Sequence, residues 1–539
     1  MPDVAKYGFV IDQRKCIGCH ACTVACKSEN DVPLGAFRTW VKYVEKGVFP
    51  NTRRYFTVER CQHCEDAPCI EICPTKALYK RPDGIVDFNS DRCIGCKACM
   101  QACPYDALYI DPRSNTAAKC HYCAHRTDRG LLPACVIVCP TEAIIAGDLE
   151  DPTSEIARTI AREPVQVRRP DQGTRPPVFY VGADETAITP GLAAQPESYM
   201  WSQRGPADVD LEPKGWLLEM AKSAAGSAKG STSGSARPDY YPPAHASTTN
   251  AVTVYDVGHP KPWGRKVSSY LWTKSIGGGA LAVAGPLLAL GVVGSTLTIG
   301  ASVLAWLFTL LTAILLVWDL KRPDRFWRVA LTPNLRSWLT WGAYILMAYG
   351  ALSGIWFLAG LLGLDGVIGV LVWPGVLLGL AAAGYSAFLF GQAEGRDFWQ
   401  SPLLLWQLLA AAALAGAAGL ALVAVTLDGG NAPLLSLLSG ILLAGVLAMA
   451  GVVLAELYTP HANKDVATAA ALITRGPFAG RFWLGYGLAG AALPAVILLG
   501  IFGAGLPLWS SALAAIVALA GLWLYEDVWI RAGQSVAMS

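Results

Sequence analysis

Sixteen cysteines, all between Cys16 and Cys139, constrain the fold of this 539-residue chain more than any other feature. They fall into four groups of four. The groups are Cys16, Cys19, Cys22 and Cys26; Cys61, Cys64, Cys69 and Cys73; Cys93, Cys96, Cys99 and Cys103; and Cys120, Cys123, Cys135 and Cys139. The first and third groups have the spacing C-x2-C-x2-C-x3-C, in which three thiolates of one loop reach one iron–sulfur cubane and the fourth reaches its neighbour. The spacing therefore predicts 4Fe-4S clusters with all sixteen cysteines as ligands.

Two other uses of cysteine fit this pattern less well. A disulfide framework is typical of short chains in oxidising compartments, and no cysteine of this chain lies outside the four groups. Structural zinc uses paired C-x2-C knuckles without the longer run. Two histidines, His63 and His121, lie inside cysteine loops. Either could donate a hydrogen bond to the cluster ligands, but we favour solvent-facing loop residues, because ligation by the ring would leave thiolates spare.

The cysteine region is internally repeated. Cys16-Ile-Gly-Cys-His-Ala-Cys matches Cys93-Ile-Gly-Cys-Lys-Ala-Cys, and Ile72-Cys-Pro-Thr matches Val138-Cys-Pro-Thr. Two copies of a two-motif unit predict a duplicated α+β ferredoxin-like domain with four clusters over residues 1–190. Such a series of clusters would carry electrons over a long distance.

Elements around the motifs are expected to be short. Each motif should be a loop followed by a short helix, with small β-hairpins between motifs, and 85–88 and 109–111 have strand character. The polar, proline-rich segment 151–216 is predicted to wrap the domain with little regular structure. A Ser/Ala/Gly-rich stretch, 222–250, is predicted to be a flexible linker. Extension and linker together occupy 191–264.

The remainder of the chain is poor in charge. Charged residues make up 16% of the whole sequence, against roughly 25% in soluble proteins. Uncharged runs cover 275–318, 337–364, 366–393, 398–427, 429–455 and 482–525. A membrane-spanning helix needs roughly 20 apolar residues, so the first and last runs are long enough for two helices each. Residues 265–539 are therefore predicted to form an all-α membrane domain of eight transmembrane helices.

Charge also predicts orientation and excludes one class of partner. The lysines and arginines of 266–539 lie on one side of the predicted spans, and the loops on the other side carry none. The positive-inside rule then places the iron–sulfur domain on the cytoplasmic face of the inner (plasma) membrane. The N-terminus has neither an apolar signal core nor a twin-arginine run, which agrees. With a net charge of +2 and no basic cluster in the first half, nucleic-acid binding is excluded.

Both halves resemble known families. The cysteine groups of residues 1 to about 190 resemble the four-cluster electron-transfer subunit of molybdopterin oxidoreductases such as dimethyl-sulfoxide and polysulfide reductases. Residues 265–539 resemble the eight-helix, NrfD-like membrane anchor of polysulfide reductase. The matching motifs there are Asp319-Leu-Lys-Arg-Pro-Asp-Arg-Phe-Trp, Phe398-Trp-Gln-Ser-Pro-Leu-Leu and Arg531-Ala-Gly-Gln. These parts are usually separate polypeptides and are fused here.

The resemblance implies a subunit of an oxidoreductase complex. Electrons would pass between a membrane quinone (menaquinone or ubiquinone), four 4Fe-4S clusters and a separate catalytic subunit carrying molybdenum or tungsten. Haem is not expected, and His461 is the single histidine of the membrane half. The implied ligand sets are Cys16, Cys19, Cys22 and Cys139; Cys26, Cys120, Cys123 and Cys135; Cys61, Cys64, Cys69 and Cys103; and Cys73, Cys93, Cys96 and Cys99.

A quinone site needs hydrogen-bond donors and a proton carrier inside an apolar cleft. Charged groups at membrane depth are functional candidates by default. The candidates are Tyr270, Lys274, Asp319, Tyr385 and Glu456, with Tyr385 at a pocket-lining position of the resembling family. Asp319 and Tyr385 rank highest, although an interfacial anchor or a loop salt bridge is an equal alternative for each of the five.

Two alternative functions remain open. In an ion-translocating module, carboxylates such as Glu394, Asp397 and Glu456 would carry protons across the membrane. A proton path needs titratable groups throughout the bilayer, whereas the charges here are confined to one face. Related anchors also serve hydrogenases. Electron transfer with quinone is favoured over both.

Overall fold

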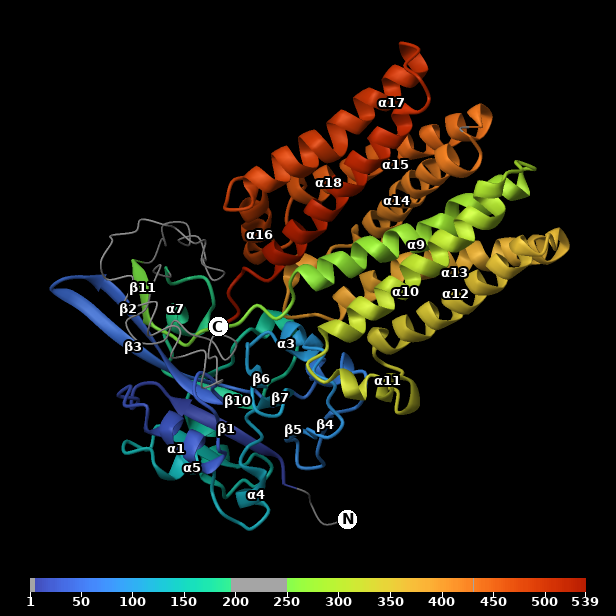
Figure 1. The fold of residues 1–539 in the computed structure, drawn as a ribbon. Helices are drawn as coiled ribbons and strands as arrows, with labels where there is room; N and C mark the ends of the chain where they lie inside the picture. Colours follow the sequence, from blue (N-terminus) through green and yellow to red (C-terminus); the bar gives the residue numbers. More distant parts are fainter. Residues whose placement is uncertain (1–4, 195–249, 430) are drawn as a thin grey trace, which may run out of the picture. The chain divides into compact units, whose positions relative to one another are not determined.

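The computed structural model describes residues 5–194, 250–429 and 431–539 (Figure 1). The chain divides into two compact units, each with its own interior. One consists of Met1–Ile70, Lys76–Pro262 and Ser535–Ser539, and the other of Glu71–Thr75 and Trp263–Gln534. We call them the cysteine unit and the helical unit.

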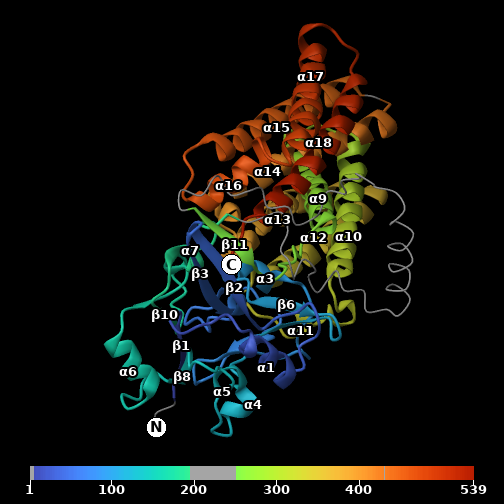
Figure 2. The same cartoon turned by 90° about the vertical axis from the view of Figure 1, so that its left-hand side faces the viewer.

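The cysteine unit is built around a four-stranded sheet in the order β8-β1-β10-β9 (Figure 2). The strands are Ile144–Asp148, Tyr7–Asp12, Val178–Val181 and Val165–Gln166. β1 pairs antiparallel with β8 and parallel with β10. Phe9, Val10 and Ile11 are fully buried, because a strand covered on both faces needs a continuous apolar run.

Small hairpins and short helices surround this sheet. The hairpins are β4–β5 (Leu78–Lys80 and Val86–Phe88) and β6–β7 (Leu108–Asp111 and Thr116–Lys119). The short helices that follow cysteine loops are α1 (Ala21–Glu29), α2 (Pro68–Glu71), α3 (Ala98–Ala102), α4 (Ala124–Thr127) and α5 (Ala134–Ile137). This arrangement confirms the predicted α+β ferredoxin-type class.

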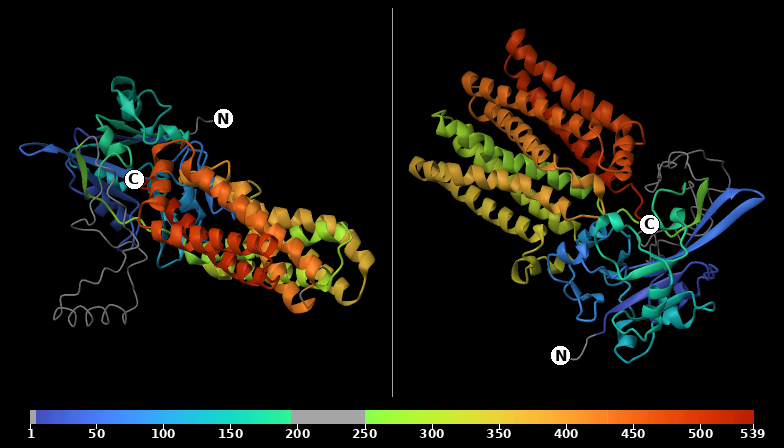
Figure 3. Two further views of the ribbon diagram at one scale, coloured as in Figure 1. Left: turned by 90° about the horizontal axis from the view of Figure 1, so that it is seen from above. Right: turned by 180° about the vertical axis from the view of Figure 1, so that it is seen from behind.

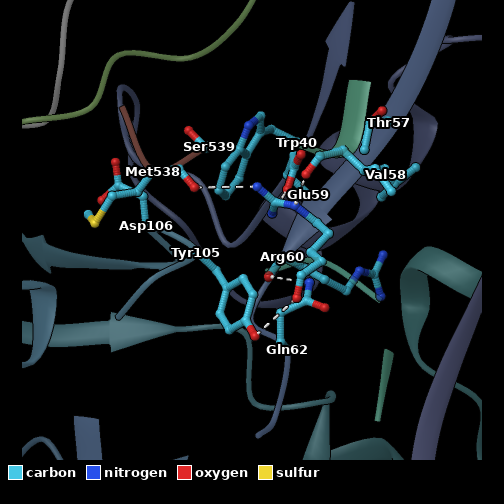
Figure 4. Close-up of polar contacts among 12 residues, drawn as sticks. Trp40, Thr57, Val58, Glu59, Arg60, Gln62, Tyr105, Asp106, Met538 and Ser539 are labelled. Carbon is cyan, nitrogen blue, oxygen red and sulfur yellow. Dashed lines mark hydrogen bonds and ion pairs between the residues drawn. The ribbon is translucent and has the colours of Figure 1, made fainter. Parts of the chain in front are cut away.

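A second sheet has the order β11-β2-β3, with strands Ala251–Tyr255, Thr39–Val48 and Asn51–Arg60. The end of β3 carries Glu59 and Arg60 into the interior of the unit, where both are 0% exposed (Figure 4). Glu59 forms an ion pair with Arg168, and Arg168 Nη2 also donates to the Met538 carbonyl at 3.4 Å.

The prediction of little regular structure in 151–216 is wrong for the described part of that segment. It contains α6 (Glu155–Arg162), β9, β10 and α7 (Glu185–Ile188). The four apolar residues of β10 suffice for a strand because β1 supplies its hydrogen-bonding partner. Likewise 251–255, expected within the linker, forms β11 along the edge of β2. The remaining linker residues, 195–249, lie outside the described residues.

The helical unit is a bundle of long helices that run side by side (Figure 3). Its long helices are α9 (Arg265–Ala289), α10 (Ala301–Asp319), α12 (Trp338–Leu361), α13 (Asp365–Gly391), α14 (Leu404–Leu427), α15 (Ala432–Tyr458), α17 (Leu493–Gly503) and α18 (Ser510–Gly533). π-helical turns, Thr296–Gly300 and Arg481–Ala492, extend α10 and α17 at their starts. Short helices α11 (Arg328–Leu331) and α16 (Lys464–Thr474) lie in connections.

Seven helices in the described part of the chain are long and apolar enough to cross a membrane. α9 is not among the seven, because three serines, Thr273, Lys274 and three successive glycines interrupt its apolar residues. The eighth predicted span therefore stays a prediction.

Glycines let α9 pack in the middle of the bundle. A Cβ on Gly279 would overlap the Ala412 carbonyl, and one on Gly416 would overlap the backbone of Gly279. α9 and α14 therefore approach backbone to backbone, as small residues permit in membrane helices. Lys274, also on α9, is 1% exposed.

Candidate functional site

Left-handed residues shape the cysteine loops. His20 and Lys97 take positive φ values immediately before α1 and α3, and Gly18 and Gly95 do so inside the loops. A Cβ on Gly18 would lie 2.5 Å from the Phe56 ring. The close approach and the positive φ together explain why glycine occupies this position.

The cysteines come together in sets drawn from different motifs. Most of the sixteen are buried. One cavity is lined by Cys26, Cys120, Cys123 and Cys135, which form one of the sets implied by the family resemblance. Electrostatic contacts group the members of two further sets, Cys16, Cys19, Cys22 and Cys139, and Cys61, Cys64, Cys69 and Cys103. In the last set, Cys93, Cys96 and Cys99 lie in the cysteine unit and Cys73 lies in the helical unit.

The environment of these thiols fits iron–sulfur cubanes. Burial raises the pKa of Cys22 and that of Cys103 to about 12, so these thiols ionise near neutral pH only beside a strong cation. The amides of Gly95 and Ala117 donate to Cys93 Sγ at 3.4 and 3.3 Å. Such N–H···S bonds to the ligating sulfurs are among the factors that set cluster potentials.

The two loop histidines have different surroundings. His63 is 2% exposed, its Nδ1 accepts from the Val86 amide at 3.2 Å, and its ring meets Tyr122 edge-on. The prediction that it faces solvent is wrong, because β5 covers the loop. His121 is half-buried, lies 3.3 Å from Arg38 Nη1 and stacks on His125.

A buried polar group occupies the helical unit. It consists of Tyr270 and Lys274 from α9, Tyr385 and Ser386 from α13, and Glu526 from α18. Lys274 Nζ donates to Ser386 Oγ at 2.7 Å and lies 4.9 Å from the centre of the Tyr385 ring. The hydroxyls of Tyr270 and Tyr385 both interact with Ser386. Three residues proposed from sequence thus meet at one point.

Glu526 is the member that sequence reasoning missed. It is 4% exposed and interacts electrostatically with Lys274. Within the described residues neither of its carboxylate oxygens has a hydrogen-bond partner. The sequence did contain a signal for this residue. Glu526 directly follows the uncharged run 482–525, just as Glu456 directly follows the run 429–455.

The other two sequence candidates lie elsewhere in the helical unit. Glu456, near the end of α15, accepts a hydrogen bond from Tyr525 at 3.3 Å. Asp319, the last residue of α10, is half-buried and interacts electrostatically with Tyr270. Tyr525 immediately precedes Glu526 on α18. Helix α18 therefore contributes Glu526 to the buried polar group and Tyr525 to the hydrogen bond with Glu456.

A groove follows α9 and α18 beside the buried polar group. It is lined by Ser269, Trp272, Thr273, Ala520, Trp523 and Leu524. Its polar atoms are largely satisfied, since Trp523 Nε1 donates to Ser269 Oγ at 3.1 Å and Trp272 Nε1 to the Leu519 carbonyl at 2.8 Å. The groove therefore offers an apolar surface next to Tyr270 and Lys274.

Three family models match the chain. The model described as polysulphide reductase, NrfD, matches residues 254–537. A 4Fe-4S dicluster domain matches 52–149, and a 4Fe-4S binding domain matches 14–31. The matches cover the helical unit and all four cysteine motifs.

Known relatives resemble the cysteine half. A tetrathionate reductase subunit of Salmonella typhimurium is 43% identical over 202 residues, which are 37% of this chain and 80% of the relative. A polysulfide reductase subunit of Wolinella succinogenes is 44% identical over 181 residues, 33% of this chain and 94% of the relative. Protein NrfC of Escherichia coli is 42% identical over 179 residues, 33% of this chain and 80% of the relative.

Proposed function

Because this chain belongs to the polysulphide reductase NrfD family and also carries 4Fe-4S domains, we propose that it passes electrons between a membrane quinone and a separate molybdopterin catalytic subunit. It is a multi-pass membrane protein with an electron-transfer and anchoring role. Relatives named as subunits of tetrathionate and polysulfide reductases support a catalytic partner. The cysteine unit would face the cytoplasm, as the charge distribution favours.

We assign the sixteen cysteines as ligands of four 4Fe-4S clusters, in the four sets given by the family resemblance. Each bound cluster supplies a one-electron redox centre. The protein's part is to hold buried thiolates at fixed positions, to donate amide N–H groups to their sulfurs and to exclude water. The cavity lined by Cys26, Cys120, Cys123 and Cys135 carries this assignment.

The buried polar group would bind the quinone head. The Lys274 ammonium and the hydroxyls of Tyr270 and Tyr385 would donate hydrogen bonds to a quinone carbonyl. Glu526, which has no hydrogen-bond partner in the described structure, would accept a proton when quinol is oxidised. The groove beside α9 and α18 would hold the isoprenoid tail. Asp319 and Glu456, near the ends of α10 and α15, would exchange protons with water.

The experiment compares Lys274→Met with Lys266→Met in the full chain. Both lysines are on α9, but the Lys266 ammonium lies over the Trp318 ring instead of in the buried group. Anaerobic reduction of the clusters by added quinol is followed by absorbance, with iron content measured in parallel. Lys274→Met should slow reduction about 10²-fold, the usual effect of removing one preorganised donor. Equal rates for the two variants, at normal iron content, would exclude Lys274 from the quinone site.

Metal analysis of the complex isolated from native membranes tests the partner. Molybdenum or tungsten is expected with the copurifying subunit, whereas nickel would indicate a hydrogenase. Ion translocation is less well supported, because Glu394 and Asp397 lie in the connection that follows α13, outside the long helices.

A further inference from the structure

A basic residue precedes the first cysteine of every motif. The four are Lys15, Arg60, Arg92 and Lys119. Their surroundings differ sharply, because Lys15 and Arg92 are exposed to solvent, whereas Arg60 and Lys119 are each 0% exposed. The buried pair are the last residues of β3 and β7, which direct both side chains inward.

Arg60 precedes the second motif but contacts cysteines of other motifs. Its Nη1 donates to Cys135 Sγ at 3.5 Å, and its guanidinium lies 4.3 Å from the centre of the Phe9 ring. Its principal electrostatic partners are Cys135, Cys120 and Cys22. The first two belong to the set Cys26, Cys120, Cys123 and Cys135, which is built mainly from the fourth motif.

Lys119 precedes the fourth motif and makes the reciprocal contacts. Its Nζ donates to the Cys120 carbonyl at 2.9 Å and to the Val86 carbonyl, and it interacts with the Cys61 thiol and with Cys69. Both cysteines belong to the set Cys61, Cys64, Cys69 and Cys103, which is built mainly from the second motif. Each half of the duplicated domain thus extends one cation toward the cysteine set of the other half.

The two cations lie close to a common point. The buried His63 ring interacts electrostatically with both, and Cys61 interacts with Cys120 across the same region. Burying a cation in a dry interior is costly unless an anion compensates. The principal charged partners of Arg60 are thiol groups, whose negative charge is greatest when they ligate iron.

We propose that Arg60 and Lys119 are a pair of redox-tuning cations that raise the reduction potentials of the two clusters held by Cys26, Cys120, Cys123 and Cys135 and by Cys61, Cys64, Cys69 and Cys103. This rests on the proposed cluster ligation. Each electron step oxidises one cluster, reduces its neighbour and adds one negative charge to the acceptor, with no atom transferred. A buried cation stabilises that added charge. Water screens Lys15 and Arg92, which therefore contribute little.

The test is an EPR-monitored redox titration of the full chain with Arg60→Met and, separately, Lys119→Met. Each variant should lower the midpoint potential of one cluster, a different cluster in each case. The reduction equilibrium should change at least tenfold, which is about 59 mV for one electron. Arg60→Lys should retain most of the parent potential. Lys15→Met and Arg92→Met are matched controls from the same motif position, and they should change every equilibrium less than threefold.

Iron content separates the two levels of the proposal. A parent protein with far fewer than about sixteen irons would contradict the cluster assignment itself. A second outcome is full iron content while the Arg60 and Lys119 variants shift the midpoint potentials no more than the exposed controls do. That result would overturn the tuning role and leave the cluster assignment in place. Where a methionine variant loses iron, Arg60→Gln and Lys119→Gln keep a polar side chain without charge, and the same lowering is expected.

Discussion

The two units bury charge in different ways. In the cysteine unit, Glu59 and Arg168 are 0% and 1% exposed and form an ion pair. His259 Nδ1 lies 2.7 Å from Asp106, and its Nε2 lies 3.5 Å from Asp256. In the helical unit, Lys274 donates to the neutral Ser386, and no hydrogen bond to the Glu526 carboxylate is present among the described residues.

This difference separates structural charges from functional ones. A buried ion pair holds one arrangement, and removing one partner leaves the other charge buried without compensation. A buried charge that lacks such a partner costs stability and is retained when a ligand or a proton completes it. We therefore expect changes in the first class to affect unfolding and changes in the second class to affect turnover.

The largest effect is expected for Arg168→Met, which leaves the Glu59 carboxylate buried without its ion-pair partner. The free energy of unfolding should fall by about 3–5 kcal/mol, measured as the denaturant midpoint for loss of iron–sulfur absorbance. Glu59→Gln combined with Arg168→Met should recover much of the loss. Arg54→Met, which breaks the exposed pair with Glu45, is the control and should cost less than about 1 kcal/mol. Equal losses for Arg168→Met and Arg54→Met would refute the structural role of the buried pair.

Glu526→Gln should slow turnover without lowering stability, the opposite of what is expected for Arg168→Met. Stability should stay the same or rise, because the amide avoids the cost of burying a charge. Quinol-linked reduction of the clusters should slow about 10²-fold, since a general base is lost. Asp428→Asn makes the same change in a carboxylate that accepts from the Ser295 and Thr296 amides, and it should leave the rate unchanged. Loss of stability at a normal rate would place Glu526 among the structural charges.

A smaller, pH-dependent effect is expected from His259. Burial alone would lower its pKa, but Asp106 and Asp256 raise it to about 10. The folded-state value exceeds the unfolded value of about 6.5, so the stabilisation is complete below pH 6.5 and disappears as pH rises through 10. His259→Gln should flatten the unfolding midpoint between pH 6.5 and 10, and a profile as steep as that of the parent would contradict this assignment.

The sequence predicted what local spacing encodes. Cysteine groups specify loop chemistry within a few residues, and uncharged runs specify long apolar helices, so the fold class of both halves followed. Which strands and loops pack against one another is not specified by these local spacings. β10 is a strand because β1 lies beside it, and His63 is buried because β5 covers its loop.

The polar group of the helical unit was predictable only in part. Tyr270, Lys274 and Tyr385 were proposed individually from charge and family position, but no pattern indicated that α9 and α13 bring them onto Ser386. Asp319 ranked highest together with Tyr385, yet it lies at the end of α10. Helix packing, which depends on the close approach of α9 and α13 at Gly278 and Gly379, decides which of these side chains meet.

Strand β11 gives the fused chain an unexpected modularity. Ala251, Val252 and Thr253 pair with Lys46, Glu45 and Val44, after the segment that separates the two sequence families. A chain cut between residues 194 and 250 would therefore yield two polypeptides that share one sheet, the second supplying an edge strand to the first. Strand complementation would let the pieces reassemble after separate synthesis, as in a split-protein system.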